Sequence, residues 1–134
     1  MLIFLWLDTL LFSDEEIYNK ADLKSWMYLR FKTILQLDEN FLLGYQLGGL
    51  YLSVVKDDIL GAKDLYEMGL KKYPKDFSLN YQLGQLYLIE LENYKLAYKY
   101  LSKIAFDPRA PDFIHSLLAR LQGDLNNMPS VEFI

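Results

Sequence analysis

A twelve-residue segment recurs in this chain, and the repeat constrains the fold more than any other feature of the sequence. Residues 41–52 read FLLGYQLGGLYL and residues 77–88 read FSLNYQLGQLYL. Nine of the twelve positions are identical at a separation of 36 residues. Self-similarity at such a period is typical of proteins that stack copies of one small structural unit. The sequence therefore predicts a duplicated unit.

Each copy opens a pair of amphipathic helices. Apolar residues recur at helical spacing over 41–54 and again in a stripe that begins at Ala62, with a turn at 56–58 between them. Pro74 is expected to stop the second helix. The next pair repeats this order, and its parts are a helix over 77–90, a turn at 92–93, a stripe that begins at Ala97, and a stop at Pro108.

A residue able to cap a helix precedes a Phe at three points along the chain. Asn40-Phe41, Asp76-Phe77 and Asp112-Phe113 are each separated by 36 residues. Asn and Asp are favoured N-cap residues because their side chains accept hydrogen bonds from free backbone N–H groups. We therefore expect helices to begin at all three points.

The flanks complete one domain over residues 1–123. We expect a degenerate first unit over 1–40, whose main helix begins near Ser13 or Asp22 and ends at Leu37. Units over 41–76 and 77–110 follow. A final capping helix over 111–123 would end at Gly123 and cover the apolar face of the last repeat, and 124–134 would form a tail.

The first twelve residues, MLIFLWLDTLLF, are almost entirely apolar. The run is shorter than the roughly 20 residues of a membrane-spanning helix. It also lacks the basic start and small-residue cleavage site of a signal peptide. We expect a short buried helix, and the alternative is a natural chain that begins earlier and carries a membrane anchor.

Charge and composition exclude several classes of function. The 134 residues carry a net charge of -4, which disfavours a nucleic-acid partner. With no Cys, the chain can form neither disulfides nor thiolate metal sites. His115 is the only His, and no phosphate-binding loop or strained nucleophile turn accompanies it. We predict no enzymatic activity, no cofactor and no metal site.

The repeated residues resemble the tetratricopeptide repeat, which has a Leu-Gly, Tyr, Ala, Phe and Pro pattern. The matching positions are Leu47-Gly48, Tyr51, Ala62, Tyr66 and Pro74, then Leu83-Gly84, Tyr87, Ala97, Leu101 and Pro108. The resemblance implies an all-α fold in which about seven helices form antiparallel pairs stacked into a right-handed superhelix. It places Gly48 and Gly84 where paired helices cross closely. The overall residue pattern is also similar to that of bacterial proteins of this class.

The resemblance also implies a concave groove lined by the first helix of each pair. The positions that would line it are Leu42, Tyr45, Gln46, Gly49, Leu52, Ser78, Tyr81, Gln82, Gln85 and Leu88. None of these residues is charged, which disfavours a clamp for a C-terminal carboxylate. Tyr and Gln side chains can instead bind an extended segment or a helix by area burial and hydrogen bonds. The alternative is that Tyr45 and Tyr81 merely pack against each other and against the next unit.

Two kinds of function follow from these expectations. The first is a non-enzymatic scaffold that binds a peptide or a helix of a partner protein in the uncharged groove. The second is a structural part of a larger assembly, which would self-associate through the apolar N-terminal helix. Attachment to a membrane would require a longer natural chain.

Overall fold

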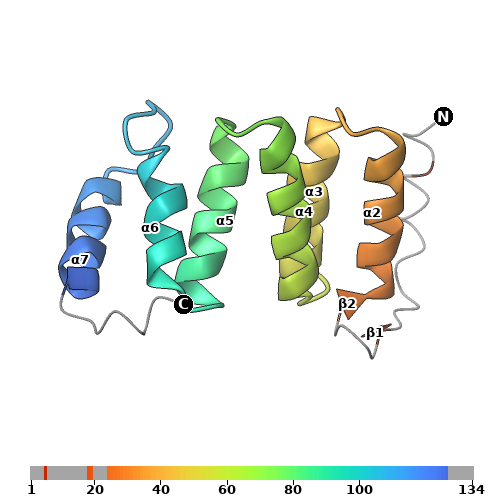
Figure 1. Cartoon of the computed structure of the whole chain (residues 1–134), viewed down its shortest axis with the longest axis horizontal. Helices are drawn as coiled ribbons and strands as arrows, with labels where there is room; N and C mark the ends of the chain where they lie inside the picture. The colour runs from red at the N-terminus through yellow and green to blue at the C-terminus, as the bar shows by residue number, and fades with distance from the viewer. Residues whose placement is uncertain (1–4, 6–17, 20–23, 127–134) are drawn as a thin grey trace. The chain divides into compact units, whose positions relative to one another are not determined.

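The chain folds into α-helices, as a computed structural model shows (Figure 1). The structure describes residues 5, 18–19 and 24–126. The helices are α2 (Trp26–Leu37), α3 (Leu42–Val54), α4 (Ile59–Lys72), α5 (Phe77–Ile89), α6 (Tyr94–Ser102) and α7 (Ile114–Asn126). The predicted all-α class is confirmed. No helix among the described residues is long and apolar enough to cross a lipid bilayer.

A very short strand pair precedes α2. Strand β1 (Tyr18–Asn19) runs antiparallel to β2 (Lys24–Ser25), with Tyr18 opposite Ser25. The helical pattern of the sequence did not predict this pair. The buried helix expected over residues 1–12 lies outside the described residues, except for the exposed Leu5.

The chain divides into two compact units, residues 1–74 and 75–134. In the first unit, α3 packs against α4 and against α2. Its fully buried side chains include Phe31 and Leu35 of α2, Leu52 of α3 and Leu65 of α4. Each helix of the unit therefore contributes its apolar stripe to a shared core.

Two tyrosines tie the turn between α2 and α3 to the rest of the first unit. The hydroxyl of Tyr45 donates to the carbonyl of Glu39 at 2.8 Å. The hydroxyl of Tyr73, at the end of α4, donates to the carbonyl of Asn40 at 2.8 Å. These bonds hold two backbone carbonyls of the turn that follows α2, at Glu39 and Asn40.

In the second unit, α6 packs against both α5 and α7. Its core cluster consists of Leu101, Ile104, Ala105 and Ile114, and half-buried Phe77, Tyr81, Ala110, Leu117 and Leu118 pack against it. The terminal helix α7 therefore covers apolar surface of α6. That α7 caps a stacked array stays a prediction from the sequence.

The turns inside the two helix pairs have the same construction. Asp58 caps α4 by accepting from the N–H of Gly61, and Asn93 caps α6 by accepting from the N–H of Leu96. The residue before each cap, Asp57 or Glu92, has a positive φ of 52° or 50°. Both caps therefore confirm the turns expected at 56–58 and 92–93.

The two pairs are related by 35 residues, although the sequence identity has a separation of 36. Helices α3 and α5 begin and end 35 residues apart, and so do the two caps and the two positive-φ residues. A shift of one residue turns a side chain by about 100° around a helix. Leu47 is consequently exposed, whereas its identical counterpart Leu83 is fully buried.

The glycines at the two close helix crossings are also 35 residues apart. In α3 it is Gly49 that lies against α4, where an added Cβ would come within 2.6 Å of the Tyr66 ring atom Cζ. In α5 it is Gly84, where an added Cβ would lie 2.6 Å from Cγ of Leu101. The assignment of Gly84 to a close crossing is confirmed. The contact with Tyr66 places Gly49, and not Gly48, at the position equivalent to Gly84.

Three expected helix signals act differently in the structure. Asn40 does not cap α3, because the N-cap position is Phe41 and no side chain caps it. Helix α6 ends at Ser102, well before Pro108. Helix α7 passes through Gly123 to Asn126, because Gly123 does not adopt the positive φ of a helix stop. The cap expected at Asp76 is confirmed, and Asp58 and Asn93 cap α4 and α6 in the same way.

Candidate binding surfaces

The predicted groove positions on α3 are mostly inside the first unit. Tyr45, Gly49 and Leu52 are buried, and only Leu42 and Gln46 are half-exposed. Burial, and after it the charge of Glu39, raise the pKa of Tyr45. The hydroxyl of Tyr45 is occupied by the backbone bond to Glu39. Tyr45 therefore packs within the first unit and stabilises it.

Gly49 is also taken up by packing within the unit. The ring of Tyr66 fills the space where a side chain would stand. Burial of its hydroxyl, which has no hydrogen-bond partner among the described residues, raises the pKa of Tyr66 to about 12, and the nearby Ser53 acts in the opposite direction. A tyrosine in this setting is held neutral by its apolar surroundings. The face of α3 that carries Gly49 therefore has no surface to offer a partner.

The predicted positions on α5 are more accessible. Ser78, Tyr81, Gln82, Gln85 and Leu88 are all half-buried. The Tyr81 ring lies 5.6 Å from that of Phe77 and packs against the cluster of α6 and α7. Ser78, Gln82 and Gln85 follow one another at helical spacing, so they lie on one face of α5. This face is uncharged and polar.

The two sets of groove positions belong to different units, five to the first and five to the second. Each set is described within its own unit. A single groove formed by both stays a prediction from the resemblance.

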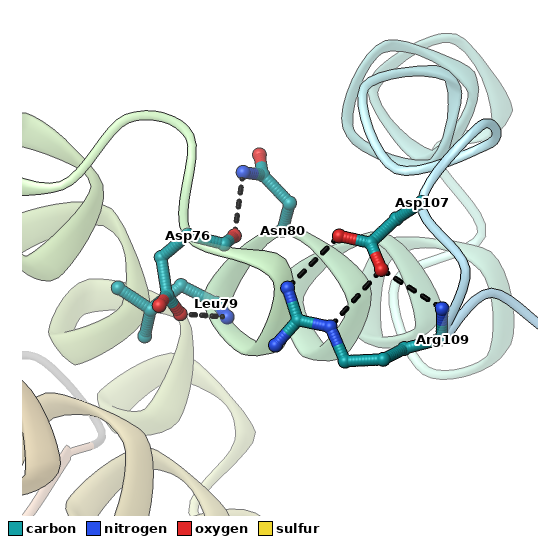
Figure 2. A network of polar contacts seen from close by, with 5 residues as sticks. All are labelled: Asp76, Leu79, Asn80, Asp107 and Arg109. Carbon is teal, nitrogen blue, oxygen red and sulfur yellow. Dashed lines mark hydrogen bonds and ion pairs between the residues drawn. The ribbon is translucent and has the colours of Figure 1, made fainter.

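A polar network lies near the N-terminal end of α5 in the second unit, and Figure 2 shows its five residues. Asp76 caps the helix by accepting from the N–H of Leu79 at 2.9 Å, and the Asn80 amide donates to the Asp76 carbonyl at 2.8 Å. Asp107 accepts from the guanidinium of Arg109 at 2.8 and 3.0 Å and from its backbone N–H at 2.8 Å. These bonds lower the pKa of Asp107 to about 2.

The cation of this network also contacts an aromatic face. The Arg109 guanidinium lies 4.5 Å from the centre of the Phe77 ring, within the range of a cation–π interaction. The network therefore holds the segment between α6 and α7 against the start of α5. The Asp107 carboxylate and the Arg109 guanidinium satisfy each other's hydrogen-bonding groups, which is the arrangement of a structural contact.

A small pocket of about 170 Å³ lies within the first unit. It is lined by Leu35, Gln36, Glu39, Tyr45, Met68, Lys71 and Lys72. Lys72 forms an ion pair with Glu39 at 2.9 Å, and both side chains are well exposed. An exposed pair of this kind contributes at most about 1 kcal/mol.

The described part of the chain contains no group of three or more His, Cys, Asp or Glu residues placed to hold a metal ion. His115 is exposed on α7, where its ring lies 5.3 Å from that of Phe106.

Sequence reasoning missed one surface feature, which we call the α3 stripe. It consists of Leu43, Leu47, Leu50 and Val54, all exposed. Their spacing of four, three and four residues was visible in the sequence. The Leu47-Gly48 pair matches the Leu-Gly motif of the repeat, which places its Leu inside the fold, so the sequence did not predict that Leu47 is exposed.

Comparison with known proteins does not assign this chain to a family. Neither the models of known protein families nor the curated proteins gave a match to the sequence.

Proposed function

We propose that this chain is a non-enzymatic protein-interaction module of the tetratricopeptide repeat class, whose helix pairs stack into a right-handed superhelix. The repeated pair supports this proposal. Each pair has a first helix without charge, a capped turn with one positive-φ residue, and a glycine at the crossing. Proteins built from such units commonly use the surface of the first helices to bind partners.

The observation that carries the proposal is the half-exposed, uncharged face of α5. Ser78, Gln82 and Gln85 present hydroxyl and amide groups, and Leu88 adds apolar area one turn later. Helix α5 contains no charged residue along its length. A peptide or helix bound there would gain hydrogen bonds to the amides and buried area, without help from charge.

This chemistry predicts the salt dependence of binding. Interactions between exposed charges are screened at physiological ionic strength, whereas apolar contacts are not. A partner segment bound to the α5 face should therefore keep its affinity when the salt concentration rises from about 0.1 to 0.5 M. A loss of more than about tenfold would point to a charge-steered site elsewhere.

The direct test uses 15-residue peptides selected from a displayed random library on the full chain. Their affinity is then measured for the wild-type protein and for the Gln82→Ala/Gln85→Ala variant. We expect the variant to bind at least about tenfold more weakly, because binding energy is concentrated in a few central contacts. The matched control is Gln122→Ala on the exposed surface of α7, which should bind like the wild type.

Two results would contradict the proposal. One is a folded Gln82→Ala/Gln85→Ala variant with unchanged affinity for every selected peptide. The other is a selection that yields no peptide above background. The structural role through residues 1–12 stays a separate prediction, since that segment lies outside the described residues.

A further inference from the structure

Helix α3 has two apolar faces, and within the part of the chain that the structure describes only one of them is covered. Leu43, Leu47, Leu50 and Val54 are 54%, 41%, 38% and 70% exposed. With 3.6 residues per turn, these four positions fall within about 60° of one another. They form a continuous stripe along the whole helix.

The α3 stripe lies opposite the face that packs in the first unit. The buried residues of the helix are Gly44, Tyr45, Gly48, Gly49 and Leu52, and their mean direction is about 160° from that of the stripe. The helix, LLGYQLGGLYLSV, contains no charged residue. A helix that is apolar all round is normally covered on every side.

Folding of the helix pair does not require this stripe. At the structural separation of 35 residues, the equivalent positions in α5 are Ser78, Gln82, Gln85 and Ile89. Three of these four are polar, although α5 packs against its own partner helix in the same way. The apolar residues on α3 are therefore a property of the first unit alone, and they indicate a contact that α5 does not make.

We propose that the α3 stripe is the interface of a homodimer, in which α3 packs antiparallel against α3 of a second copy. The stripe is symmetric about the point between Gly48 and Gly49. A twofold axis there places Leu43 against Val54 of the second copy and Leu47 against Leu50 of the second copy. Such an interface closes on itself, because each chain supplies the same surface.

Charge and area both suit this occupant. Two uncharged helices can approach without like-charge repulsion, which an antiparallel self-pair would otherwise have to overcome. The four side chains expose on the order of 400 Å², and with flanking Gln46 and Tyr51 a pair would remove roughly 1,000 Å² from water. This is the lower end for specific interfaces, so the dimer should dissociate at micromolar concentrations. The inference stands independently of peptide binding, which is tested on α5.

The first experiment measures molar mass against concentration by sedimentation or light scattering. The wild-type chain should shift from 15.8 kDa toward twice that mass as its concentration rises. Leu47→Glu/Leu50→Glu should weaken association at least about tenfold, because it places like charges opposite each other. The matched control is Gln82→Glu/Gln85→Glu, which makes the same change 35 residues later and should associate like the wild type.

Several outcomes would overturn the dimer. A wild-type chain that stays monomeric at several hundred micromolar (on the order of a hundredfold above the expected midpoint) would leave the stripe without a second copy. An α3 variant that associates as tightly as the wild type would place self-association elsewhere, for example in residues 1–12. A partner helix that binds the stripe in a monomeric chain would replace the second copy as occupant.

The second experiment fixes the direction of the two helices and does not depend on the charged variant being folded. Because the chain has no Cys, single cysteines can be introduced without background. An oxidised mixture of Leu43→Cys and Val54→Cys chains should yield mixed dimers, whereas each variant alone should not cross-link. Cross-linking of Leu43→Cys alone would show a parallel contact, and the absence of any cross-link would contradict the interface.

Discussion

The ring of Tyr66 lies directly on the backbone of Gly49, where α3 crosses α4. A Cβ at residue 49 would come within 2.7 Å of ring atom Cδ1 and 2.6 Å of Cζ. Leu101 lies over Gly84 in the same way, 35 residues along the chain. The two crossings therefore use the same backbone approach with a large side chain in one pair and a smaller one in the other.

Gly49→Ala and Gly84→Ala should both destabilise the protein. The added methyl group meets a fully buried side chain in each case, and overpacking of this kind costs about 1–3 kcal/mol. The control is Gly123→Ala, because nothing lies within 4 Å of its added Cβ. Within a helix, this change should stabilise the protein by up to about 1 kcal/mol. Urea unfolding of the three variants measures the order, and equal small shifts would contradict the crossings.

Gly61→Ala should destabilise the protein, although a glycine near a helix start would ordinarily tolerate alanine. An added Cβ would lie 2.8 Å from Cγ of Asp58, whose carboxylate accepts from the N–H of Gly61 at 2.9 Å. Displacing this buried cap should cost about 1 kcal/mol. In Asp58→Ala, which already lacks the cap, Gly61→Ala should be neutral or stabilising. A double-mutant cycle by denaturant unfolding tests this, and simple additivity would contradict it.

Ionisation of Tyr66 should destabilise the protein in alkaline solution. Its folded pKa of about 12 lies above the usual value of 10.0, because burial disfavours the charged form. The neutral form therefore contributes full stability below pH 10, and this contribution is lost as the pH rises from 10 to 12. The loss should be on the order of 2–3 kcal/mol. Tyr66→Phe should reduce this slope, and an unchanged slope would show that other groups cause it.

The elements of the fold could be predicted from sequence because their signals are local. Asp76 caps α5 as its position suggested, and the turns expected at 56–58 and 92–93 end in the caps Asp58 and Asn93. Each cap depends on one side chain and the next three residues, so it can be read without knowledge of tertiary contacts.

The rotation of α3 could not be predicted in this way. The identity of residues 41–52 and 77–88 suggested that Leu47 and Leu83 have the same surroundings. The turns at 55–58 and 90–93 have equal length, so the one-residue difference is not absorbed there. Instead, the side chains of residues 41–52 are rotated by about 100° around the axis of α3, compared with those of residues 77–88 around α5. Which side of α3 faces the core depends on how α2 and α4 pack against it. The sequence pattern within α3 alone does not contain this information.

This rotation also explains the candidate sites. The sequence predicted a groove on α3 because its residue types are nearly those of α5. In the structure, however, Tyr45 and Gly49 face the core of the first unit. The exposed α3 stripe is the other result of the same rotation. A surface prediction transferred from one repeat to the next therefore fails when the register differs by one residue.

The most direct test of the 35-residue register compares Leu47→Ala with Leu83→Ala, two identical changes in two nearly identical segments. The free energy of unfolding is measured at low protein concentration, where association does not contribute. Leu83 is fully buried, so its loss should cost about 2–5 kcal/mol, whereas loss of the exposed Leu47 should cost less than about 1 kcal/mol. Equal losses of several kcal/mol would contradict the account and restore the 36-residue register.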